Sequence, residues 1–201
     1  VRTYRFNHPE LPSASVLKED IRKIVSNIGD YIHEDIDIVV GGPPCQGFSM
    51  AGARIRGNSF IDDPRNYLFK HYVNVVRIVR PKGFVLENVK GLTNWDSGRA
   101  LKLLMEELSK PIEYNGKSYS YTITQPKVLN AVDYGVPQYR ERLILVGNRN
   151  GLDFTYPTPI DESERKTVRD AIGDLPEPEA PSEMAQIVAK SIKGRREKHG
   201  Y

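Results

Sequence analysis

Residues 41–49, with the sequence GGPPCQGFS, constrain this chain more than any other segment. They hold the only cysteine among 201 residues, Cys45, and they follow the apolar run 36–40, which predicts a buried strand. Two consecutive prolines fix φ twice and remove two backbone donors, so the turn is rigid. A strand that ends in such a turn places a nucleophile at the carboxyl edge of an α/β sheet. The alternative is a buried structural cysteine, but the constrained turn favours a functional thiol.

Composition limits the class of protein. A chain of 201 residues, 39% hydrophobic and 27% charged, is typical of one soluble domain, or of one domain with an appendage. No apolar run reaches the length of a membrane span, and the first residues lack a signal-peptide core. A single cysteine fits a reducing, cytoplasmic compartment, and four scattered histidines predict no metal site. The net charge of +3 allows a polyanionic partner without requiring one.

The hydrophobic pattern alternates between strands and helices. It predicts helices over 16–31, 66–80 and 98–109, and strands over 36–40, 84–87, 119–128 and 142–146. This rhythm predicts a parallel or mixed sheet covered by helices. The long polar segment 46–66 predicts a functional loop, because structureless loops of that length are otherwise uncommon. The C-terminal part, from Gly151, is polar and rich in proline, with one short helix predicted from a Thr167–Asp170 capping pair to Gly173.

Two predicted strand ends carry reactive side chains. Cys45 follows one strand and Glu87 ends the next, and parallel neighbours bring their carboxyl ends to the same rim. A thiolate nucleophile and a carboxylic acid could then face one substrate. A buried Glu87 could keep its proton near neutral pH because burial disfavours the charged form. The alternative for Glu87 alone is a helix cap or an ion pair.

Arginines form a third element of the predicted site. Arg140 and Arg142 are alternate residues at the start of a predicted strand, so they are expected to face the same way and to hold a carboxylate, a phosphate or a carbonyl. The alternative is a surface ion-pair stripe that includes Glu141. The 46–66 loop also carries arginines, among them Arg65, which suits a flap over a polyanion or a plain solvated loop.

Together these segments resemble the DNA cytosine-5 methyltransferases. Residues 43–49 (PPCQGFS) resemble the nucleophile motif of that family, 87–89 (ENV) its acid motif and 138–142 (QYRER) its Gln-x-Arg-x-Arg motif. Residues 63–69 and 130–138 resemble the segments that lead into the helix after the catalytic loop and into the arginine motif. Order and spacing agree over residues 1–150. The resemblance implies an α/β, Rossmann-like methyltransferase sheet with helices on both faces.

The resemblance also implies a mechanism on double-stranded DNA. A cytosine is flipped out of the duplex, since its ring face is unreachable while stacked. Cys45 would attack C6, Glu87 would hydrogen-bond N3 and the exocyclic amine, and Arg142 would bind the base carbonyl oxygen. Arg140 would support the thiolate or the acid. C5 would then accept a methyl group from S-adenosylmethionine.

Further site residues follow from the same motifs. The residues implied to lie at the S-adenosylmethionine site are Asp20, Ile21, Pro44 and Leu68. Those implied to contact DNA are Gln46, Ser49 and Arg65. A bacterial, nucleoid-associated modification enzyme of a restriction–modification system is the role that this family implies, with neither a metal nor a membrane involved.

The sequence departs from the family pattern at both ends. The Gly-rich loop that wraps the cofactor and the acid that grips its ribose do not occur here, nor do the closing motifs. We therefore expect residues 1–150 to be a partial catalytic core that binds S-adenosylmethionine poorly in isolation. Residues 151–201 are expected to be a connection and the start of a target-recognition region, or a tail.

Two other readings of the function stay open. One is a cytosine-5 methyltransferase of the same family that acts on transfer RNA. The other is a non-catalytic nucleic-acid-binding subunit, or one half of a split enzyme whose second polypeptide carries the missing motifs. The presence of Cys45, Glu87, Arg140 and Arg142 argues against a chain that has lost its chemistry.

Overall fold

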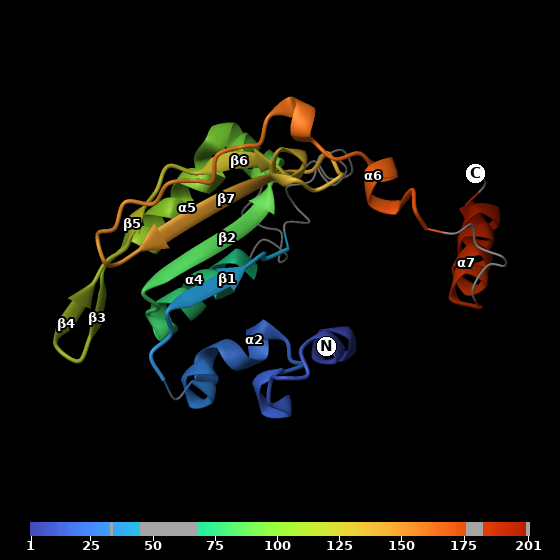
Figure 1. The fold of residues 1–201 in the computed structure, drawn as a ribbon. Helices are drawn as coiled ribbons and strands as arrows, with labels where there is room; N and C mark the ends of the chain where they lie inside the picture. Colours follow the sequence, from blue (N-terminus) through green and yellow to red (C-terminus); the bar gives the residue numbers. More distant parts are fainter. Residues whose placement is uncertain (33, 45–67, 176–182, 200–201) are drawn as a thin grey trace. The chain divides into compact units, whose positions relative to one another are not determined.

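The structure is a computed structural model that describes residues 1–32, 34–44, 68–175 and 183–199. These residues fall into two compact units, Val1–Arg165 and Lys166–Tyr201. The first unit contains the sheet and the predicted site (Figure 1).

A mixed five-stranded sheet forms the centre of the first unit. Its order is β1 (Ile38–Gly41), β2 (Gly83–Val89), β7 (Glu141–Asn148) and β5 (Thr122–Ile123), and β6 (Lys127–Asn130) also pairs with β7. β1 runs parallel to β2, whereas β7 runs antiparallel to β2, β5 and β6. The predicted mixed α/β sheet is therefore confirmed, and the carboxyl ends of β1 and β2 lie on the same rim (Figure 1).

The main core lies between one face of this sheet and two helices. Helices α4 (Leu68–Val79) and α5 (Arg99–Ser109) pack on that face, close to the bounds that the sequence predicted. Because side chains alternate along a strand, Phe84 and Leu86 of β2 point into the core, where they meet Leu143 and Leu145 of β7. On the opposite face, the hydroxyl group of Tyr156, in the segment after β7, donates to the carbonyl of Ile144 over 2.9 Å.

The expectation that the strand before Cys45 is buried is wrong. β1 is an edge strand, and no described strand pairs with its other edge. Ile38 and Val40 are 61% and 72% exposed, because they point away from the face that α4 covers. A continuous apolar run predicts a strand, but it does not say which neighbours will cover that strand.

The predicted helix over 16–31 is also wrong as a single element. The chain instead forms α1 (Arg2–Asn7), η1 (Ser13–Ser15), α2 (Ile21–Ile24) and η2 (Val25–Tyr31), of which η1 and η2 are 3-10 helices. α2 begins only at Ile21 because Asp20 caps it by accepting a hydrogen bond from the Arg22 amide, and Asn27 interrupts η2 with non-helical dihedral angles. The helical spacing nevertheless identified Val16 and Val25, which are both buried.

A single strand over 119–128 is wrong as well. The hairpin of β3 (Ile112–Tyr114) and β4 (Lys117–Tyr119) precedes the short strands β5 and β6, with Pro126 between them. The hairpin turns at Asn115 and Gly116, which both have positive φ, as a two-residue primed turn requires. That Asn-Gly pair was a signal for the hairpin in the sequence. The guanidinium of Arg80 lies 3.6 Å above the Tyr114 ring and joins the hairpin to the end of α4.

Shorter elements complete the two units. Among the described residues of the first unit, the remaining 3-10 helices are η5 (Lys90–Thr93), η6 (Trp95–Gly98), η7 (Ala131–Tyr134) and η8 (Glu162–Glu164). In the second unit, α6 (Val168–Ile172) has the predicted capping box between Thr167 and Asp170 and ends at Gly173. Its other helix, α7 (Glu183–His199), was not predicted. Among the helices of the described residues, none is both long and apolar enough to cross a membrane.

Candidate active site

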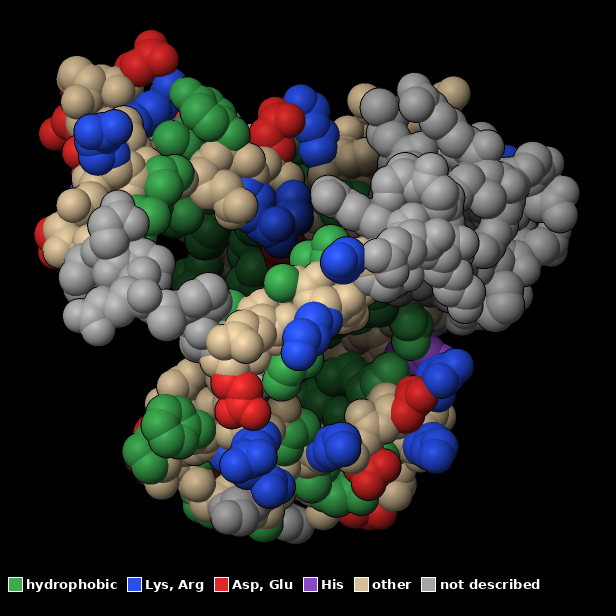
Figure 2. Space-filling view, turned by 90° about the vertical axis from the view of Figure 1, so that its right-hand side faces the viewer, with side chains coloured by type: hydrophobic (Ala, Val, Ile, Leu, Met, Phe, Trp, Pro, Cys, Tyr) green, Lys and Arg blue, Asp and Glu red, His purple; other side chains and the backbone are tan. Residues whose placement is uncertain are grey.

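Three strand ends converge on one rim of the sheet. β1 leads into Gly42, Pro43 and Pro44, β2 ends with Glu87-Asn88-Val89, and β7 begins at Glu141. The pairing of Gly41 with Leu86, and of Val89 with Arg142, places these ends side by side. Figure 2 is a view from the side toward which the carboxyl ends of β1 and β2 point in Figure 1. Cys45, Gln46, Ser49 and Arg65 lie outside the described residues.

Glu87 and Arg142 form an ion pair at this rim. The Nε atom of Arg142 lies 2.8 Å from Oε1 of Glu87, and both side chains project from the face opposite to α4 and α5. The Glu87 side chain is 41% exposed, so the expectation of a buried, protonated carboxyl is wrong in its premise. Alternation along β2 explains this, because Leu86 and Asn88 point inward and Glu87 therefore points outward. The ion pair that was the alternative reading of Glu87 is present, at the predicted rim.

Gly42 lies against the Glu87 carboxylate. A Cβ atom at Gly42 would be 3.0 Å from Oε2 of Glu87, so the turn that leads to Cys45 and the acid are in close contact. A side chain at this position would push the carboxylate aside by a few tenths of an ångström, and glycine leaves that space to the acid. The sequence suggested a turn at this point, and the structure adds the contact that brings the turn to the acid.

Asn88 is a site residue to which the sequence analysis gave no role. Its side chain is buried, with 6% exposed, and its Nδ2 donates to the carbonyl of Pro43 over 3.2 Å. Its Oδ1 accepts from the Val89 amide at 2.9 Å. Both ends of this amide are therefore used, as buried polar groups require. Asn88 ties β2, one residue after Glu87, to the turn that precedes Cys45. An asparagine next to Glu87, at the end of a run of apolar residues, was the signal for it.

Tyr72 of α4 supports the same turn from beneath the sheet. Its hydroxyl donates to the Val85 carbonyl over 3.0 Å, and its ring faces Gly41, where a Cβ atom would be 2.6 Å from Cε2. Burial raises the pKa of Tyr72, with a smaller contribution from Tyr121, so the hydroxyl stays a neutral donor. The contact between Tyr72 and Gly41 thus fixes the position at which the turn begins.

Arg140 and Arg142 are held differently. Arg140 precedes β7, and its backbone pairs with the segment after β6: its amide donates to Oδ1 of Asn130 over 2.9 Å, and its carbonyl accepts from the Ala131 amide at 3.0 Å. Its guanidinium is exposed and forms no ion pair with a described residue, whereas Arg142 pairs with Glu87. The next residue along, Glu141, pairs with Lys90 at 2.7 Å, so part of the predicted surface ion-pair stripe also exists.

The four predicted cofactor residues lie on three neighbouring segments. Asp20 and Ile21 begin α2, Leu68 begins α4, which α2 contacts, and Pro44 follows β1. The Asp20 carboxylate accepts from both the amide and the Nε of Arg22, at 2.9 and 3.0 Å, and this contact holds the pKa of Asp20 well below its usual range. Ile21 and Leu68 are partly exposed apolar residues, which suits contact with a flat apolar group.

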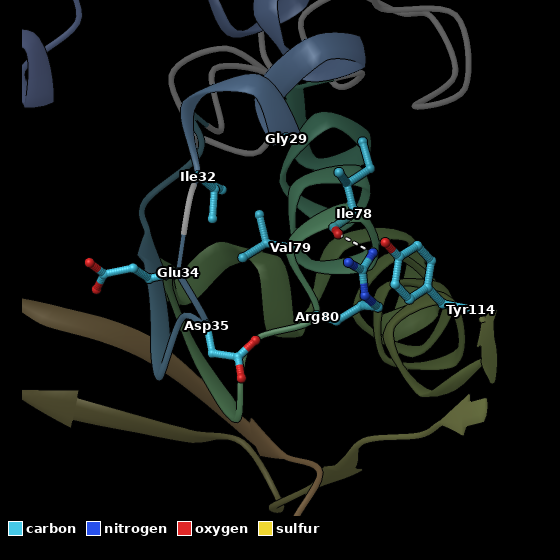
Figure 3. Close-up of a pocket in the computed structure, with 8 residues that line it drawn as sticks. All are labelled: Gly29, Ile32, Glu34, Asp35, Ile78, Val79, Arg80 and Tyr114. Atoms are coloured by element: carbon cyan, nitrogen blue, oxygen red, sulfur yellow. Dashed lines mark hydrogen bonds between the residues drawn. The ribbon is translucent and has the colours of Figure 1, made fainter. Parts of the chain in front are cut away.

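A separate pocket of about 440 Å³ lies at the opposite end of the sheet. It is lined by the segment before β1, the C-terminal end of α4 and Tyr114 (Figure 3). Ile32 and Val79 point into it, and none of the predicted site residues lines it. Within the described ranges, no three His, Cys, Asp or Glu side chains gather in a way that could hold a metal ion.

The sequence of this chain matches a known family of proteins. The model of the C-5 cytosine-specific DNA methylases matches residues 1–200 of this chain. The chain belongs to this family. The resemblance carried by the nucleophile, acid and arginine motifs is thereby confirmed, although the roles of the single residues remain predictions.

Relatives by sequence are bacterial modification enzymes. The Type II methyltransferase M.AquIA of Picosynechococcus sp. is 43% identical over 99% of this chain and 85% of its own length. M1.HphI of Haemophilus parahaemolyticus is 43% identical over 87% of this chain, and M.XorII of Xanthomonas oryzae is 45% identical over 90%. The chain spans only 43% and 40% of the lengths of these last two relatives.

Solved structures agree on the fold. A DNA modification methyltransferase from an Escherichia coli prophage superposes with a TM-score of 0.58 and 29% identity, over 81% of this chain and 42% of that protein. A DNMT2 mutant of Spodoptera frugiperda superposes with a TM-score of 0.51 at 22% identity, over 80% and 42%. The α/β methyltransferase fold is therefore confirmed, and this chain corresponds to less than half of each of these two proteins.

Proposed function

We propose that this protein is a cytosine-5 methyltransferase acting on double-stranded DNA. The observation that carries the proposal is the rim of the sheet. There the turn that leads to Cys45, the Glu87 carboxylate and the Arg142 guanidinium come from three adjacent strand ends. A nucleophile, an acid and a cation are the groups that activation of a cytosine ring requires.

Cys45, Glu87 and Arg142 would act on the cytosine ring in turn. The target cytosine leaves the duplex, and the Cys45 thiolate forms a bond to C6, which shifts an electron pair toward C5. Glu87, once it has taken up a proton, donates it to N3 while its other oxygen accepts from the exocyclic amine, and Arg142 binds the carbonyl oxygen, so the developing charge on the ring is neutralised. The C5 proton then leaves to a water molecule acting as base, and the bond between C6 and Cys45 breaks to return the thiolate, which restores the aromatic ring. Arg140 supports the thiolate or the acid.

S-adenosylmethionine, when bound, supplies the methyl group that C5 accepts. Ile21, Leu68 and Pro44 fit the wall of an adenine site, because they are apolar, α2 contacts α4, and Tyr72 of α4 lies against Gly41 at the end of β1. Asp20 fits a ligand less directly, since Arg22 already occupies its carboxylate, which would have to exchange partners. Asp20 would therefore shape the site through the start of α2.

Further polypeptide would complete the sheet. The second edge of β1, with which no described strand pairs, and the exposed Ile38 and Val40 support this part of the proposal, since an unpaired apolar edge strand is a template for pairing. The added part would be either more of the same chain or a second polypeptide, and it would bring the remaining cofactor contacts. Gln46, Ser49 and Arg65 would contact the DNA. The names of the relatives favour a restriction–modification role inside a bacterial cell.

The test is transfer of labelled methyl groups from S-adenosylmethionine to unmethylated genomic DNA, which offers every short recognition site, by the complete protein together with the polypeptide that completes its sheet. We expect label at C5 of cytosine, complete loss of transfer with Cys45→Ala, and a loss of at least about 100-fold with Glu87→Gln. Transfer to transfer RNA but not to DNA would instead support the RNA reading. DNA binding without transfer by the complete protein would support a non-catalytic subunit.

A further inference from the structure

An ordered loop next to the candidate active site presents an aromatic side chain to solvent. The loop covers residues 131–140 between β6 and β7, and two hydrogen bonds close its neck. The Arg140 amide donates to the side chain of Asn130, and the Ala131 amide donates to the Arg140 carbonyl. Asn130 precedes the 3-10 helix η7, but its side chain binds Arg140 and makes no capping bond to η7.

Further backbone contacts fix the loop within this neck. The Val136 amide donates to the Ala131 carbonyl over 3.2 Å, and the Gln138 amide donates to the Val136 carbonyl over 2.7 Å. Gly135 takes the left-handed conformation that this turn requires, with φ of 81°. Tyr139 therefore stands on a backbone whose neighbours on both sides are hydrogen-bonded.

The Tyr139 side chain is 78% exposed, compared with 51% for Tyr4 and 47% for Tyr31. Gln138 and Arg140, its neighbours, are also exposed. A single exposed aromatic residue is common and carries no meaning by itself. Here it lies three residues before Arg142, which pairs with Glu87, in the segment that leads into β7 at the rim of the candidate active site.

We propose that Tyr139 is a DNA-contacting residue, which stacks on a base left unstacked near the flipped cytosine. This inference rests on the proposed function. An aromatic ring on a fixed backbone loses little entropy when it stacks, and stacking tolerates any sequence because every base has a π-face. A tyrosine flanked by Gln138 and Arg140 also matches the mixture of aromatic and basic groups that binds unstacked nucleotides.

The test is the affinity of the intact methyltransferase for a labelled duplex fragment of the genomic DNA that it methylates, measured by fluorescence anisotropy. We expect Tyr139→Ala to raise Kd by about 5- to 100-fold, and Tyr139→Phe to stay within about twofold, because the ring carries the contact. Tyr31→Ala, a change at an exposed tyrosine of η2, is the matched control and should bind like the unaltered protein.

The salt dependence of the binding separates stacking from charge. The slope of log K against log salt should be unchanged in Tyr139→Ala, because no phosphate contact is removed. Binding by Tyr139→Ala that equals the unaltered protein, or a loss with Tyr139→Phe as large as with alanine, would overturn the inference and leave the proposed function standing. Failure of the unaltered protein to bind DNA or to transfer methyl groups would overturn both.

Discussion

The two faces of the sheet have different roles, one in stability and the other in the proposed chemistry. On the face that α4 and α5 cover, Phe84, Leu86, Leu143 and Leu145 are at most 1% exposed. On the opposite face, the same strands present Glu87 and Arg142 as a partly exposed ion pair, and β1 presents Val40 at 72% exposure. Strand alternation therefore places residues for stability and residues for chemistry next to each other in sequence. Substitution of Leu86 should therefore lower stability, whereas substitution of its neighbour Glu87 should lower activity with little effect on stability.

The largest effect on stability is expected on the helix-covered face. Leu86→Ala should lower the free energy of unfolding by about 2–5 kcal/mol, because it leaves a cavity in a core with no exposed surface at this position. Val40→Ala, on the face opposite to α4 and α5, is the control and should change the free energy of unfolding by less than about 0.5 kcal/mol. Urea unfolding measures both. Equal losses would show that this opposite face is covered in solution and would end the comparison.

A smaller loss is expected where α4 meets the end of β1. Gly41→Ala should lower the free energy of unfolding by about 1–3 kcal/mol, because the new methyl group would overlap the Tyr72 ring. Gly29→Ala is the matched control, since a Cβ atom there meets nothing within 4 Å. Thermal unfolding of the two variants tests this. A Gly41→Ala variant as stable as the control would show that Tyr72 does not fix the turn.

Asn88 is expected to matter for both stability and activity, because its side chain points inward and also holds the turn before Cys45. Asn88→Ala should lower the free energy of unfolding by about 1–3 kcal/mol, because the Pro43 carbonyl would lose its buried partner. Asn74→Ala, on the exposed side of α4, is the control and should leave the free energy of unfolding unchanged. Methyl transfer measured on the same samples should fall for Asn88→Ala even at temperatures where it is fully folded. Full activity in the folded variant would reduce Asn88 to a packing residue.

The smallest change in stability is expected at Glu87. Glu87→Gln should alter the free energy of unfolding by at most about 1 kcal/mol, because a partly exposed ion pair gains little over its hydration. This small difference should shrink further at high salt, where the pair is screened. Denaturant unfolding at low and high ionic strength measures it. A loss as large as that of Leu86→Ala would mean that the pair is structural, and the two faces would no longer differ in role.

Sequence patterns located most elements but not their surroundings. The 3.6-residue spacing predicted α4 and α5 closely, and the Thr167–Asp170 pair predicted the start of α6. The same spacing failed over 16–31, because the Asp20 cap and the Asn27 kink override it with local contacts. The apolar run before Cys45 predicted a strand correctly but a buried one wrongly, since exposure depends on which segments pack beside it.

By itself, the sequence determined the family, the order of the motifs, and the presence of two strands, β1 and β2, that lead to reactive residues. These follow from residue type and spacing, which a chain carries in any conformation. Only the tertiary structure decided that Glu87 faces Arg142 at 2.8 Å, that Gly42 touches the acid, and that Asn88 binds Pro43. Such contacts join residues far apart in sequence, and the register between strands, which no local pattern encodes, determines which side chains meet.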